Sequence, residues 1–159
     1  MKEFINIKRF YLIIFLICVI SLISVVYIEY ILEQNPCKLC IYQRIPYLFG
    51  IFICFFGYNY FKNIFWLYTL LTIFILSTIL SGYHMGIENN IFNEYSGCTN
   101  ENLNITNKSD LLDSLKNTVI GCKNVNFRIL GLSLATINFI VSLTISVISY
   151  LILRNEKNK

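Results

Sequence analysis

Two apolar runs separated by two polar residues decide the fold of this chain: IPYLFGIFICFFGYNYFKNIFWLYTLLTIFILSTILSGY, residues 45–83. The first run covers residues 45–61 and the second covers residues 64–84, with Lys62 and Asn63 between them. About 20 apolar residues in a helix cross the ~30 Å hydrocarbon layer of a bilayer. Because so short a break allows only a tight turn, the pattern predicts an antiparallel hairpin of two membrane-spanning helices.

Two further apolar runs flank this hairpin, at residues 10–31 and 127–153. The sequence therefore predicts an all-α membrane protein, a four-transmembrane-helix bundle that forms one integral membrane domain over residues 1–159. The composition agrees, because 56% of residues are hydrophobic and 14% are charged, whereas soluble domains are about one quarter charged. A signal peptide is the alternative for residues 10–31, but the run is too long for one and no small-residue cleavage site follows it.

Positive charges orient the four spans. The termini and the short hairpin turn hold a set of basic residues: Lys2, Lys8, Arg9, Lys62, Arg154, Lys157 and Lys159. The positive-inside rule places these segments in the cytoplasm, so the loops at residues 32–44 and 85–126 face outward. In the longer loop, Ser109 resembles a helix N-cap before leucines at helical spacing, which predicts a short amphipathic helix. The net charge of +4 does not indicate nucleic-acid binding, since the basic residues form no patch among aromatic side chains.

The six cysteines fall into two groups. Cys18 and Cys54 lie inside the first and second apolar runs, where a thiol behaves as a small hydrophobic side chain. The other four lie in the two loops assigned to the outer side, which is the oxidising side of a bacterial inner membrane: Cys37, Cys40, Cys98 and Cys122. Three interpretations compete for these four: disulfides that brace the loops, a metal site, or redox exchange.

The C-x-x-C spacing of Cys37 and Cys40 favours redox exchange. A disulfide across so small a loop stabilises little, and zinc sites usually use two close pairs, which Cys98 and Cys122 do not form. We therefore predict no metal site. Arg44 follows Cys40 by four residues and, with the start of the second span, favours a thiolate at Cys40.

Arg44 and the single histidine, His84, also lie at similar depth on the outer side. Alone, each has an ordinary interpretation: an arginine at lipid headgroups and an interfacial histidine. Beside a redox dithiol, they provide a cation and a switchable donor. Such a pair is suited to an oxygen-bearing lipophilic acceptor.

Residues 37–44, CKLCIYQR, closely match the C-x-L-C-x-Y-[QE]-R signature of the bacterial disulfide bond formation protein B (DsbB) family. The Tyr83-His84 step at the end of the third span is similar to the family's histidine region. Cys98 and Cys122 are similar to its second cysteine pair, and FRILGLSLA at residues 127–135 is similar to its entry into the fourth span. The resemblance covers nearly the whole chain.

The resemblance implies a disulfide-generating oxidoreductase of the inner membrane, with cytoplasmic termini and periplasmic cysteine pairs. It would reoxidise a periplasmic DsbA-like thioredoxin-fold dithiol oxidase and pass the electrons to ubiquinone or menaquinone in the membrane quinone pool. The Cys98–Cys122 disulfide would accept electrons from the partner and Cys37–Cys40 would carry them onward. Cys40 would contact the quinone, with Arg44 and His84 holding its oxygens.

Two other functions remain open. A quinone reductase similar to vitamin K epoxide reductase also has four spans and a C-x-x-C pair, but its pair usually lies late in the chain. A structural membrane protein would use its disulfides only to brace loops. The state of the four loop cysteines when quinone is depleted distinguishes these alternatives.

Overall fold

The computed structural model describes residues 2–93, 122, 128–129 and 131–157. Four segments are long and apolar enough to cross a membrane, at residues 7–30, 38–59, 64–88 and 134–157, which confirms the expected bundle. The amphipathic helix expected near Ser109 lies outside the described residues. The elements, in chain order, are α1 (Lys2–Tyr30), α2 (Lys38–Tyr42), α3 (Ile45–Asn59), α4 (Ile64–Glu88), β1 (Arg128–Ile129), β2 (Leu132–Ser133) and α6 (Leu134–Lys157).

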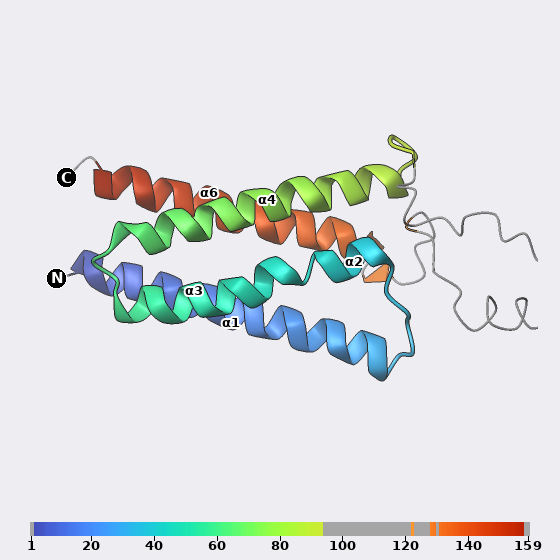
Figure 1. The fold of residues 1–159 in the computed structure, drawn as a ribbon, viewed down its shortest axis with the longest axis horizontal. Coiled ribbons are helices and arrows are strands. Elements are labelled where there is room, and N and C mark those ends of the chain that lie inside the picture. The colour runs from blue at the N-terminus through green and yellow to red at the C-terminus, as the bar shows by residue number, and fades with distance from the viewer. Residues whose placement is uncertain (1, 94–121, 123–127, 130, 158–159) are drawn as a thin grey trace, which may run out of the picture.

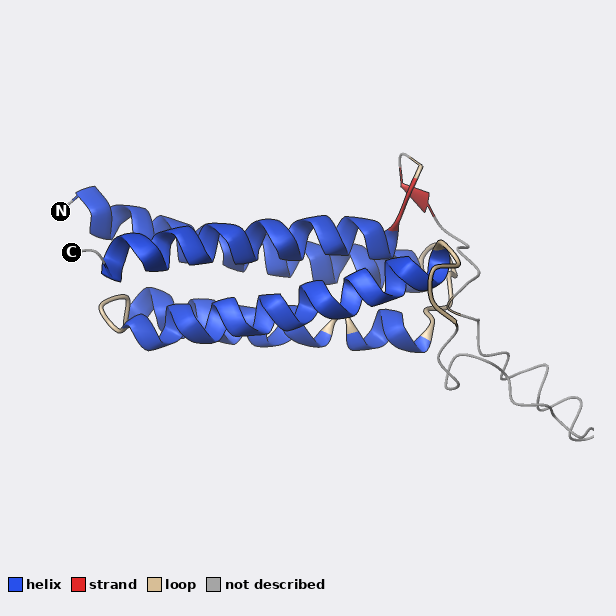
Figure 2. Ribbon diagram, turned by 90° about the horizontal axis from the view of Figure 1, so that it is seen from above, coloured by secondary structure: helices blue, strands red, loops and turns tan. Residues whose placement is uncertain are grey.

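The long helices pack as two pairs, α1 along α3 and α4 along α6, and α3 also packs against α4 (Figure 1). Figure 2 shows the helices running nearly parallel to one long axis. Both chain ends lie at one end of the bundle, whereas α2 and the small β1–β2 hairpin lie at the other (Figure 1). This arrangement brings the first loop, the end of α4 and the start of α6 together.

The second span begins earlier than the sequence suggested, because α2 forms a short helix in the expected loop. Cys37 is its N-cap, and the Cys37 Sγ accepts a hydrogen bond from the Cys40 backbone N–H at 3.2 Å. Pro46 lies in the first turn of α3. It has no N–H with which to continue the hydrogen bonds of α2, so a break between α2 and α3 is expected there.

The core and the outer surface of the bundle are both apolar. Tyr11, Leu70 and Phe74 are buried at its centre, together with Cys18 and Cys54, which are free thiols. Their burial agrees with the packing role expected for both cysteines. Large side chains on the outside are also apolar, as a helix surface in contact with lipid must be; examples are Ile23, Phe52, Ile79 and Leu151.

Small polar residues line the contact between α4 and α6. Ser77, Ser81, Ser142 and Ser149 are fully buried, and the Oγ atoms of Ser77 and Ser142 lie 2.9 Å apart. Small residues let membrane helices approach closely, and hydroxyl groups bond between them. The result is a polar contact inside an otherwise apolar bundle, and Asn138 extends it toward the cysteines, since the Ser142 hydroxyl donates to its Oδ1 at 3.3 Å.

Gly57 allows α1 and α3 to pack closely, so we predict that Gly57→Ala destabilises the bundle. A Cβ atom at this position would lie 2.5 Å from Cε1 of Tyr11. Overpacking of this kind costs about 1–3 kcal/mol, measurable as a lower midpoint of thermal unfolding in detergent. Gly82→Ala is the matched control, because its Cβ would lie 3.2 Å from Phe139 and the loss should be smaller. Equal losses would show that the Tyr11 contact is not the cause.

Candidate active site

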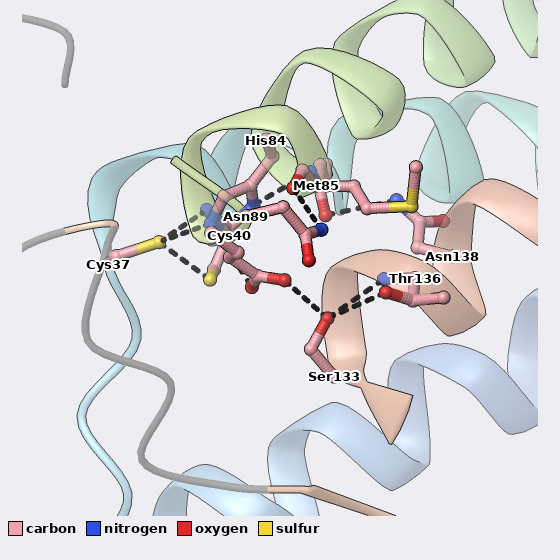
Figure 3. Close-up of polar contacts among 10 residues, drawn as sticks. Cys37, Cys40, His84, Met85, Asn89, Ser133, Thr136 and Asn138 are labelled. Atoms are coloured by element: carbon pink, nitrogen blue, oxygen red, sulfur yellow. Dashed lines mark hydrogen bonds and ion pairs between the residues drawn. The ribbon is translucent and has the colours of Figure 1, made fainter. Parts of the chain in front are cut away.

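Three segments distant in the sequence place their side chains together at the α2 end of the bundle (Figure 3). The Cys37 Sγ lies 2.7 Å from the Cys40 Sγ and 3.6 Å from the His84 Nε2. The Cys122 Sγ lies close by, because the Sγ atoms of Cys37 and Cys122 and one ring nitrogen of His84 all lie within 4.8 Å of one another. Cys37, His84 and Cys122 are each at most 5% exposed. The structure thus brings four residues singled out in the sequence into one buried cluster.

The cysteines of this cluster are in different oxidation states. Cys37 and Cys40 are free thiols, whereas Cys122 is disulfide-bonded. Cys98 lies outside the described residues, so its pairing with Cys122 stays a prediction. A thiol pair next to a sulfur already in a disulfide is the arrangement that thiol–disulfide exchange requires.

Cys37 is the thiol most ready to attack. Its pKa is lowered to about 5, first by a hydrogen bond from the Cys40 thiol and further by His84 and the Cys40 backbone N–H, although burial opposes the shift. Cys37 is therefore a thiolate at neutral pH. This differs from the expectation that Arg44 would favour a thiolate at Cys40.

Arg44 is held by a partner that the sequence did not suggest. Its Nη1 lies 2.5 Å from the Oε2 of Glu29, in the last turn of α1. Its Nε is buried and has no hydrogen-bond partner among the described residues. The ion pair with Glu29 thus fixes the guanidinium in place. A carboxylate near the end of an apolar run is costly unless it is paired, and that cost is the signal that points to Glu29.

Both ring nitrogens of His84 face polar groups. Nδ1 lies 3.0 Å from the Gln43 Nε2, and Nε2 lies 3.8 Å from the Glu88 Oε1 as well as near Cys37. Glu88 follows His84 by one helical turn and accepts a hydrogen bond from the Ser133 hydroxyl. Sequence reasoning missed Gln43 and Glu88, although Gln43 lies inside the C-x-L-C-x-Y-[QE]-R signature at residues 37–44.

A cavity of about 330 Å³ opens beside the cluster. Cys37, Cys40, Arg44 and His84 lie along it, and apolar side chains of α1 and α6 form much of its wall: Ile20, Val25, Ile28, Ala135, Ile137 and Val141. Its volume is at the lower end of the range for small-molecule sites, ~300–1,000 Å³. The site therefore offers a reactive dithiol to a lipophilic ligand of limited size.

A thiol pair beside a disulfide-bonded cysteine, at one end of a bundle of membrane-spanning helices, is typical of a membrane thiol–disulfide protein. The family described as "Disulfide bond formation protein DsbB" matches residues 7–152. The chain belongs to this family, and is therefore a multi-pass inner-membrane protein of disulfide-bond formation. It is also similar to "Uncharacterized protein RP370" of Rickettsia prowazekii (strain Madrid E), with 28% identity over 153 residues that cover 92% of this chain and 88% of the relative.

We predict that Cys37 in the reduced protein is alkylated with a midpoint near pH 5. A thiol whose pKa is about 5 is a thiolate above that pH, so the rate should fall as pH drops through this value. Cys40→Ala removes the largest cause of the shift and should move the midpoint up toward the ordinary thiol value of 9.0. Mass spectrometry of iodoacetamide-treated protein measures the rate for each peptide.

The core thiols of Cys18 and Cys54 are internal controls for this experiment. Both are buried away from the cavity that Cys37 lines, so they should stay unlabelled in the folded protein. A midpoint near 9 in the unsubstituted protein would contradict a thiolate at Cys37.

Proposed function

We propose that this protein is an oxidase that reoxidises a periplasmic thioredoxin-fold dithiol oxidase and passes the electrons to membrane quinone. The observation that carries the proposal is the contact of Cys37, His84 and Cys122 within 4.8 Å, beside a cavity with apolar walls. In this proposal both termini are cytoplasmic and the cysteine pairs are periplasmic. The basic residues of the termini support that orientation. So does the position of the N and C ends opposite α2, whose N-cap is Cys37 (Figure 1).

The exchange begins outside the membrane. A thiolate of the partner attacks Cys98 of the Cys98–Cys122 disulfide, which forms a mixed disulfide and releases Cys122 as a thiolate. Cys122 then attacks the Cys37 Sγ of an oxidised Cys37–Cys40 pair and releases Cys40. Resolution of both mixed disulfides leaves the partner and the Cys98–Cys122 pair oxidised and the Cys37–Cys40 pair reduced. Each exchange forms one S–S bond and breaks one, so no further oxidant is needed until the last step.

The last step reoxidises Cys37 and Cys40. A bound quinone supplies a two-electron, two-proton acceptor, so a dithiol and a quinone give a disulfide and a quinol. Cys40 lines the cavity beside Cys37 and is the sulfur that we assign to this contact. His84 and the Cys40 thiol hold Cys37 as a thiolate, which keeps it ready for exchange.

The cavity residues fit a quinone. The apolar walls suit a lipophilic ring, and the Arg44 guanidinium, which lines the cavity, carries N–H groups that can donate to a carbonyl oxygen. The Glu29 carboxylate fixes the guanidinium at the cavity edge. We assign oxygen binding first to Arg44, and then to His84, whose ring nitrogens already face Gln43, Cys37 and Glu88. Ubiquinone and menaquinone both meet these requirements.

A structural role as a loop brace explains the site less well. Braces require disulfides, but Cys37 and Cys40 are free thiols and Cys37 has a lowered pKa. A thiolate held in a buried position is the state of a reactive cysteine rather than of a structural one.

Purified protein should reduce quinone when a reduced thioredoxin-fold partner is added, followed by loss of quinone absorbance. Cys40→Ser and Cys98→Ser should each abolish turnover, because either change interrupts the electron route. Cys54→Ser should keep turnover, since that thiol lies in the core away from the cluster. No turnover with several partners and both quinone types would overturn the proposed oxidase.

A Cys37–Cys122 disulfide should form when these are the only thiols left in the two loops. In the double variant Cys40→Ser/Cys98→Ser, mild oxidation should join them quickly, because their Sγ atoms lie within 4.8 Å. Peptide mapping under non-reducing conditions detects the bond. Cys37→Ser/Cys98→Ser, which leaves Cys40 and Cys122, is the matched control and should cross-link more slowly. Equal rates in the two variants would remove Cys37 as the point of exchange.

A further inference from the structure

A chain of side-chain hydrogen bonds runs from the middle of the bundle to the ring of His84. The Tyr47 hydroxyl donates to the Asn138 Oδ1 at 2.5 Å. The Asn138 Nδ2 donates to the Gln43 Oε1 at 3.1 Å, and the Gln43 Nε2 lies 3.0 Å from the His84 Nδ1. The chain links α3, α6 and α4, and Figure 3 shows Asn138 and His84 on their separate helices.

The hydrogen bonds of the structure give this chain one direction. An amide oxygen only accepts hydrogen bonds and an amide NH₂ group only donates them. The hydroxyls of Tyr47 and Ser142 both donate to the Asn138 Oδ1, so the NH₂ group of Asn138 faces Gln43. The Gln43 Oε1 is then occupied, and its NH₂ group faces His84. In this direction the Gln43 NH₂ group donates to the His84 Nδ1, which leaves the proton of a neutral ring on Nε2.

The other side of the ring matches this assignment. Nε2 faces two acceptors, the Cys37 Sγ at 3.6 Å and the Glu88 Oε1 at 3.8 Å. The opposite tautomer would set an N–H against the Gln43 NH₂ group and a lone pair against a thiolate and a carboxylate. Both sides of the ring thus favour the same tautomer.

We propose that Asn138 and Gln43 are positioning residues that hold His84 in its Nε2–H tautomer, so that the ring donates toward the Cys37 thiolate. Asn138 acts through Gln43, and Gln43 acts on the ring directly. The inference deepens the proposed function, and only its consequence for turnover rests on that function. Its central claim concerns the position of one proton and holds without quinone.

The single histidine of the chain makes this proton directly observable. In reduced, quinone-free, full-length protein with ¹⁵N-labelled histidine, the ring nitrogen shifts separate protonated from unprotonated nitrogens. In the neutral ring, reached by raising the pH until the two nitrogen shifts differ, we expect Nε2 to be protonated and Nδ1 to carry no proton. A neutral ring with its proton on Nδ1, or a ring that stays doubly protonated throughout the titration, would overturn the proposal.

Asn138→Leu keeps a similar volume but frees the Gln43 amide to turn. The ratio of the Nδ1–H tautomer to the Nε2–H tautomer should then rise about fivefold, because the net free energy of roughly one hydrogen bond changes an equilibrium constant by that factor. Alkylation of Cys37 should slow in parallel. Gln43→Met removes the amide at the end of the bundle and should shift the ring in the same direction, which keeps the test decisive if Asn138→Leu fails to fold.

Ser142→Ala is the matched control. It removes the Ser142 contacts with Asn138, Ser77 and Tyr47 but leaves the bonds from Tyr47 to Asn138 and from Asn138 to Gln43 in place. The tautomer should not change. If Asn138→Leu and Gln43→Met both keep the Nε2–H tautomer, Asn138 and Gln43 have no positioning role. The same conclusion follows if Ser142→Ala shifts the tautomer as strongly as they do. Absence of quinone turnover in the unsubstituted protein would overturn the proposed function and leave this result standing.

Discussion

The structure depends on one constraint: a polar side chain inside a bilayer has no water to bond and must find its partner in the protein. Tyr47, Asn138, Gln43 and His84 satisfy one another across three helices, and Arg44 satisfies Glu29. Because each group is the partner of the next, these bonds fix the ends of the helices relative to one another. The reactive sulfur atoms are attached to this bonded frame, which is why a thiolate, an imidazole and a disulfide sulfur can share a small volume.

Local electrostatics then give the two cysteines of the C-x-x-C motif different chemical roles. The Cys40 thiol and His84 both stabilise negative charge on Cys37. Cys37 thereby becomes the thiolate beside Cys122, and both Cys37 and Cys40 line the cavity. Arg44, a cation four residues from Cys40, is paired with the Glu29 carboxylate and lines the cavity. Proximity in sequence therefore did not identify which charge acts on which sulfur.

The four spans could be predicted because apolar length is a property of each segment alone. The short helix α2 could not, since it depends on a cysteine side chain acting as its N-cap. The cysteines and His84 follow from a motif and from topology. Asn138 has no local signal, because its partner Gln43 is 95 residues away and only packing of α6 beside α3 and α4 brings them together. Glu29 was likewise hidden inside an apolar run.

The ion pair between Glu29 and Arg44 joins the end of α1 to the start of α3 at the edge of the cavity. Loss of one member alone would leave an uncompensated charge where water is scarce, a change that is far more costly than losing both. We therefore expect positions 29 and 44 to change together among related sequences. Where the carboxylate at 29 is lost, the arginine at 44 should also be replaced or have another partner. The functional unit formed by the C-x-x-C motif and Arg44 thus also includes Glu29 of the first membrane helix.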